Sequence, residues 1–151
     1  MSSRPESYDA QVEWETVVAE LLAQGLGLVR PSLTDGDPEV RSMAAALIGD
    51  ASVEWTADLD LLLVAEATEP HPLARACLAE AAVTLAVRSP AGRLPGRVRQ
   101  WLRDPEGVVR FRVARTARRA PVAEDAQLAR LAEGVYDADS GAVETVWPAE
   151  V

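Results

Sequence analysis

The arginines are the side chains in this sequence whose type and spacing could bind an anionic ligand. All 15 basic residues are Arg, and a guanidinium group can bind a carboxylate or phosphate through two parallel hydrogen bonds. Arg112, Arg115 and Arg119 recur at helical spacing, which predicts one stripe on a helix. The candidate partner-binding residues are these three, together with Arg97, Arg99, Arg103 and Trp147. Two interpretations stay open: a patch that holds phosphates or an acidic protein surface, or a solvated face neutralised by acids of adjoining segments.

The sequence offers no constellation of residues for catalysis or metal binding. His71 is the single histidine and Cys77 the single cysteine, which excludes an internal disulfide, a multi-cysteine metal site and a histidine relay. The segments Gly25-Leu26-Gly27 and Pro95-Gly96 are interpreted as turns, because neither follows a strand pattern as a phosphate cradle would. We therefore expect a protein that is not an enzyme, with no cofactor and no metal.

A repeat with a period of 34 to 35 residues organises the positions that could do chemistry. Each copy has an acid, a proline, an arginine and a small apolar run, and the arginines are Arg41, Arg75 and Arg110. An acid followed by proline is typical of a helix start, because the carboxylate can accept from free backbone N–H groups. The interpreted structural framework, in which each Arg pairs with an acid of a helix-start turn, consists of Asp37, Arg41, Glu69, Arg75, Asp104 and Arg110. One further step reaches Glu144 behind Asp139, which we interpret as a degenerate fourth copy.

Apolar residues at helical spacing predict a second helix in each unit, and no segment shows the alternation of a strand. These second helices are expected near residues 54–67, 94–103 and 124–135, with Trp55 and Trp101 on their apolar stripes. A further amphipathic helix precedes the first unit. Its apolar residues Val17, Val18, Leu21 and Leu22 are expected to face inward and to cover the end of the stack, as a terminal repeat does.

The three units are similar to HEAT repeats, particularly the short bacterial type also found in phycobilin-lyase-like proteins. The resemblance covers about residues 33–136; Asp37-Pro38-Glu39-Val40-Arg41 fits the pattern best, whereas the second unit departs from it at Glu69 and Ala74. It implies an all-α fold, a right-handed α-solenoid of about three helical hairpins with a concave surface that usually binds protein. The expected organisation is one domain over residues 1–151, with a capping helix at about 8–28, repeats at 33–68, 69–103 and 104–136, and a degenerate unit at 137–151.

Charge is divided unevenly along the chain. Residues 1–70 carry a net −11, residues 71–119 a net +8 and residues 120–151 a net −6, which together give −9. Such an acidic chain repels nucleic acid at long range unless the central block forms an isolated patch. No apolar stretch approaches the length of a membrane helix, and the N-terminus lacks the apolar segment of a signal peptide, so we expect a cytoplasmic protein.

These observations predict a non-enzymatic protein–protein interaction module, an adaptor or scaffold that binds a protein partner on its concave face. One alternative is an acidic immunity-type inhibitor of a basic toxin enzyme, because charge complementarity would speed their association. The other is a nucleic-acid binder that uses the central Arg patch, which the net charge disfavours.

Overall fold

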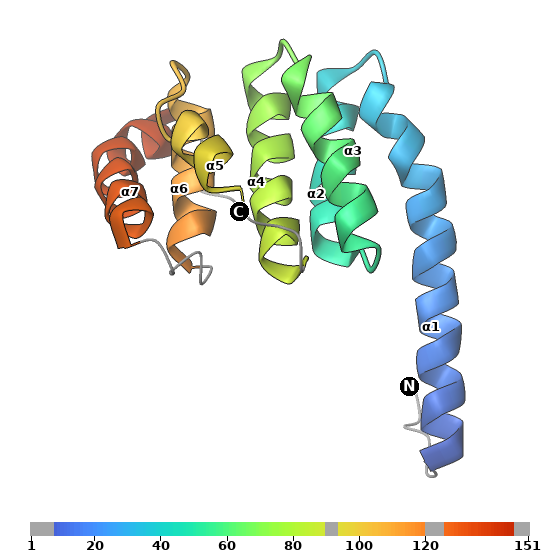
Figure 1. The fold of residues 1–151 in the computed structure, drawn as a ribbon. Helices are drawn as coiled ribbons and strands as arrows, with labels where there is room; N and C mark the ends of the chain where they lie inside the picture. Colours follow the sequence, from blue (N-terminus) through green and yellow to red (C-terminus); the bar gives the residue numbers. More distant parts are fainter. Residues whose placement is uncertain (1–7, 90–93, 120–125, 147–151) are drawn as a thin grey trace.

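The protein is all-helical over the part that the computed structural model describes, residues 8–89, 94–119 and 126–146, where no strand occurs. This confirms the all-α part of the expected fold class. In chain order the elements are α1 (Tyr8–Val29), the 3-10 helix η1 (Arg30–Thr34), α2 (Pro38–Ala51), α3 (Trp55–Ala67), α4 (Pro72–Arg88), α5 (Pro95–Trp101), α6 (Gly107–Arg119) and α7 (Ala126–Val146) (Figure 1).

The acid–proline segments lie at helix starts. Asp37 is the N-cap of α2, where its side chain accepts from the backbone N–H of Glu39, and Pro38 occupies the first turn. The α4 helix begins at Pro72, three residues after Glu69, and α6 begins at Gly107, three residues after Asp104. Proline is tolerated at these points because the first backbone N–H groups of a helix have no intrahelical partner.

The core lies between the first helices of the units, with α2 packed against α4 and α4 packed against α6 (Figure 1). The α4 helix is the most buried element, because its small residues let both neighbours approach closely. Its buried residues are Ala74, Ala76, Cys77, Leu78, Ala79, Ala81, Ala82, Val83 and Leu85. The second helices complete the core: α3 packs against α4, and α7 packs against α6.

The prediction that α1 covers the end of the stack with its apolar stripe is wrong. Val17, Leu21 and Leu22 are exposed and Val18 is only half-buried, whereas Leu26 joins the core. The physical reason is length and attachment: α1 has 22 residues and α2 has 14, and only the C-terminal end of α1 packs on the neighbouring elements. The rest of α1 extends away from the other helices (Figure 1).

The two segments interpreted as turns are helical instead, since Gly25-Leu26-Gly27 lies in α1 and Pro95-Gly96 begins α5. Two further expectations also differ from the structure. Residues 137–146 do not begin a new unit but continue α7, because the fourth copy has Ser140 where the other copies have proline near the acid, and nothing ends the helix there. Trp55 is 38% exposed rather than part of the core, and its indole N–H donates to the backbone carbonyl of Ser52. Trp101, by contrast, is buried as expected.

The contact between α2 and α4 depends on Gly49. An added Cβ at this position would lie 2.9 Å from the Cβ and 3.1 Å from the Cα of Ala81, so the two helix backbones would have to move apart. We expect Gly49→Ala to destabilise the protein by about 1–3 kcal/mol through overpacking, despite the higher helix propensity of Ala.

Gly134→Ala in α7 is the matched control, because an added Cβ there meets no atom within 4 Å. It should leave stability unchanged or raise it by up to ~1 kcal/mol. Urea denaturation monitored by circular dichroism measures both values, and equal effects of the two substitutions would contradict the close approach.

Candidate functional site

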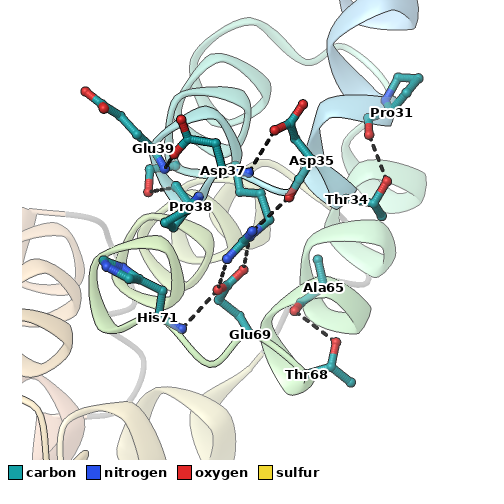
Figure 2. A network of polar contacts seen from close by, with 12 residues as sticks. Pro31, Thr34, Asp35, Asp37, Pro38, Glu39, Ala65, Thr68, Glu69 and His71 are labelled. Carbon is teal, nitrogen blue, oxygen red and sulfur yellow. Dashed lines mark hydrogen bonds and ion pairs between the residues drawn. The ribbon is translucent and has the colours of Figure 1, made fainter.

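Arg41 joins the start of its own helix to the start of the next repeat. Its guanidinium group donates through Nε and Nη2 to the carboxylate of Glu69 at 2.7 and 2.8 Å, and through Nη1 to the backbone carbonyl of Asp35 at 2.8 Å (Figure 2). Glu69 also accepts from the backbone N–H of His71 at 3.0 Å, so one carboxylate holds both the neighbouring arginine and the turn before α4. The side chain of Glu69 is 4% exposed, which makes this pair a nearly buried one.

The pairing of an arginine with an acid of the following repeat recurs in the next two units. Arg75 donates to Asp104 at 2.6 Å, and Asp104 accepts from the backbone N–H of Glu106. Arg110 donates to both carboxylate oxygens of Asp139, at 2.8 and 3.2 Å, and to the backbone carbonyl of Asp104. Five of the six framework residues therefore form a series of arginine–carboxylate pairs between neighbouring units, and we call this series the ladder. It consists of Arg41, Glu69, Arg75, Asp104 and Arg110, and it extends to Asp139. The sixth framework residue, Asp37, caps α2.

A further buried network joins the second helices and was not anticipated from the sequence. Glu66 on α3 accepts from Arg97 at 2.6 Å and from the indole N–H of Trp101 at 3.0 Å, both on α5. Nearer the N-terminus, Asp58 accepts from Arg30 at 2.7 and 2.9 Å and pairs with the hydroxyl of Ser52. The separation of Arg30 from Asp58 is 28 residues, as for Arg41 and Glu69, and that shared spacing was the signal that could have revealed the pair.

The candidate arginines do not form one cluster. Arg97 pairs with Glu66, and Arg99 lies beside it in sequence on α5, half-buried, while Arg103 is exposed beyond the end of that helix. Arg112 and Arg115 on α6 instead reach Glu80 on α4, at 3.7 and 2.9 Å. The structure thus favours partial neutralisation by an adjoining repeat at these two positions. Trp147 lies outside the described residues.

Equivalent positions of the three first helices meet on one surface. Arg115 contacts Glu80 and Arg112 contacts Cys77, and each pair is 35 residues apart. We call this surface the first-helix face; its equivalent residues are Met43, Ala46 and Asp50 on α2, Cys77, Glu80 and Thr84 on α4, and Arg112, Arg115 and Arg119 on α6. The face therefore changes from apolar and acidic on α2 to basic on α6.

An open hollow of about 430 Å³ lies on the first-helix face. Its lining residues are Asp50, Glu80, Thr84, Val87, Arg88, Arg115, Thr116 and Arg119, which come from α2, α4 and α6 and include no described residue of α5. Elsewhere on α2, Met43 and Leu47 are 62% and 49% exposed. Helical spacing predicted the arginines of α6 but not Met43, Leu47, Glu80 or Arg88. A comparison of the three copies position by position would have revealed the first three, whereas Arg88 has no equivalent on α2.

Cys77 is an unsuitable nucleophile. It is buried, and burial raises the pKa of its thiol although the nearby Arg112 guanidinium lowers it in part. Across the described residues no group of His, Cys, Asp and Glu side chains has the geometry to hold a metal ion. The same part of the chain contains no helix with the length and apolar character needed to cross a bilayer.

Comparison with models of known protein families, with curated proteins and with solved structures found no match to this chain. The chemistry of the first-helix face therefore rests on its own residues, which combine exposed apolar, acidic and basic groups.

Removing an arginine of the ladder should destabilise the fold. Arg75→Ala leaves Asp104 without its charged partner, and we expect a loss of about 1–3 kcal/mol in the free energy of unfolding. Arg41→Ala should lower the denaturation midpoint further, because Arg41 makes two hydrogen bonds to a carboxylate that is more buried than Asp104. Denaturation midpoints measure this order, and an unchanged midpoint in both variants would contradict a framework role.

Acid should weaken the ladder at Glu69. The Arg41 hydrogen bonds hold the pKa of Glu69 below its ordinary value, against the opposing effect of burial. In the unfolded chain this pKa is ~4.3, so the contribution of Glu69 to stability is complete above that pH and is lost as the pH falls through the lower folded-state pKa. The difference in unfolding free energy between the wild type and Glu69→Gln should shrink on acidification. A difference that is the same at neutral and acidic pH would contradict this assignment.

Proposed function

We propose that the protein is a non-enzymatic HEAT-like interaction module that binds a protein partner through its first-helix face. We also infer that the successive hairpins form a right-handed α-solenoid. The packing of α2 on α4 and of α4 on α6, with one arginine–carboxylate pair at each step, supports this arrangement. An adaptor or scaffold in the cytoplasm is the corresponding role.

One observation carries the proposal: equivalent positions of the three units divide into two sets. In the first set the same type of residue recurs in every unit, and its side chain makes contacts within the fold. Arg41, Arg75 and Arg110 are an example. Positions on the first-helix face do not repeat in chemistry, since Asp50, Thr84 and Arg119 occupy the same place in successive copies. The arginine–carboxylate ladder does not require the residues on this face to differ between units. We therefore attribute their differences to recognition of a partner. The resemblance to HEAT repeats implies a partner on a concave side, whereas the variable residues support a binding surface on α2, α4 and α6.

The partner should have a surface of complementary chemistry. Met43 and Leu47 offer apolar area over α2, and exposed Arg88 and Arg119 offer guanidinium groups at the hollow. A protein with an apolar patch beside acidic side chains fits both features. An immunity-type complex with a basic toxin enzyme is the second candidate, and it would instead use the acidic residues 1–70. The pairing of Arg112 and Arg115 with Glu80 counts against a nucleic-acid site.

Substitutions on the first-helix face should remove partner binding without unfolding the protein. We expect Met43→Glu and Arg119→Glu each to weaken binding at least tenfold, which is ~1.4 kcal/mol, because one places a charge in the apolar contact and the other reverses a charge. The measurement is affinity capture from cells that contain the native protein, followed by titration of the captured partner. Circular dichroism confirms that the variants are folded.

Val64→Glu is the matched control, because Val64 is 70% exposed on α3 and lies outside the first-helix face. Loss of the partner in this variant, with retention in Met43→Glu, would overturn the proposed surface. Tight, salt-sensitive binding of duplex DNA that is lost when Arg112 and Arg115 are both changed to Glu would favour the nucleic-acid alternative.

A further inference from the structure

The α1 helix carries an apolar stripe that no described part of its own chain covers. Trp14, Val17, Leu21 and Leu28 are 59%, 46%, 61% and 81% exposed, and their spacing of three, four and seven residues places them on one side of the helix. A helix of 22 residues is about 33 Å long, so the stripe extends along most of that length. Large exposed apolar surfaces of this kind are typical of interfaces.

The stripe faces away from the rest of the fold. Among the described side chains of α1, Leu26 is the buried one, and at 3.6 residues per turn it lies about 140° around the helix from Leu21. In Figure 1 the N-terminal part of α1 extends beyond the other helices, so its stripe is accessible along the helix. A second molecule can therefore reach the stripe without displacing the contacts at Leu26.

The distribution of charge along α1 selects an antiparallel copy of the same helix. The acids of α1 all lie between Asp9 and Glu20, and no charged residue lies between Leu21 and Val29. A parallel, in-register pair would place each acid beside its own copy. An antiparallel pair places the acidic half of one helix beside the uncharged half of the other. The two helix dipoles then point in opposite directions, which is the favourable arrangement.

We propose that two copies of the chain associate through α1 in an antiparallel pair whose two-fold axis passes between residues 19 and 20. In this register residues whose numbers sum to 39 lie opposite each other, as an isologous contact requires. Trp14 then faces Gly25, and Leu21 faces Val18. An added Cβ at Gly25 meets no atom within 4 Å, so this position has room for the indole ring of the other copy. Glu13 and Glu15 lie at the same level along the pair as Leu26 and Gln24 of the other copy, and no acid lies level with another acid.

Sedimentation equilibrium of the full chain tests the association. The wild type should have twice the 16.2 kDa mass of one chain, and Leu21→Glu should weaken association at least tenfold by placing a charge in the stripe. Leu21 is exposed, so this variant should keep its helical circular dichroism. Ala23→Glu is the matched control: it adds the same charge to an exposed position about 160° around the helix, level with Thr16 of the other copy, and should remain dimeric.

Disulfide formation tests the direction of pairing, in a Cys77→Ala background. A mixture of the Trp14→Cys and Gly25→Cys chains should form a mixed disulfide, whereas neither chain alone should do so, since identical positions lie about 16 Å apart along the axis. A disulfide-linked dimer of Trp14→Cys alone would show a parallel pair and overturn the proposal. A wild type of single-chain mass at every concentration would also overturn it and leave the stripe to a different protein. These outcomes do not depend on the first-helix face.

Discussion

The pairing of an arginine with the acid of the following repeat is the interaction on which the arrangement of the units depends. Arg41 and Arg110 each contact the turn before their own helix and a carboxylate about one repeat further along the chain. A buried ion pair adds little net stability, because desolvation offsets most of the attraction between the charges. Its geometry nevertheless fixes the register between neighbouring helices, since a shift of one helical turn would separate the guanidinium from the carboxylate. The stabilising free energy comes instead from the small apolar residues of α4 and the surfaces that pack on them.

The ladder was accessible to sequence analysis because its chemistry repeats. The period of 34 to 35 residues identified the first helices, and the acid–proline segments identified where they begin. The stripes of the second helices were also readable: Val98, Trp101 and Leu102 lie in the core as their spacing indicates, and so do Leu128 and Ala132. The prediction that Trp55 lies in the core was wrong. Trp55 is the first residue of α3, where a side chain on the apolar stripe still extends past its neighbours.

The remaining differences between prediction and structure arise where the sequence pattern does not specify which residue or element a side chain contacts. The sequence of α1 has apolar residues on two sides, so amphipathicity alone did not show that Leu26 faces the fold while Leu21 faces outward. The fourth acid, Asp139, keeps its place in the ladder although α7 continues past it, because pairing with Arg110 needs only a carboxylate at that spacing and not a helix start. The charge block between residues 71 and 119 did not reveal that Arg112 and Arg115 share Glu80, since that contact crosses from one repeat to another.

The two proposed surfaces use different parts of the chain and would reinforce each other. The first-helix face lies on α2, α4 and α6, whereas the exposed stripe lies on α1 and faces away from the residue that attaches α1 to the core. Pairing through α1 would therefore leave both first-helix faces of the dimer open. A partner with two or more copies of its binding surface would then bind the second face at a raised effective concentration, provided its spacing matches that of the dimer. A modest affinity at each face would suffice for stable binding, which agrees with a hollow that is open and of mixed charge rather than deep and apolar.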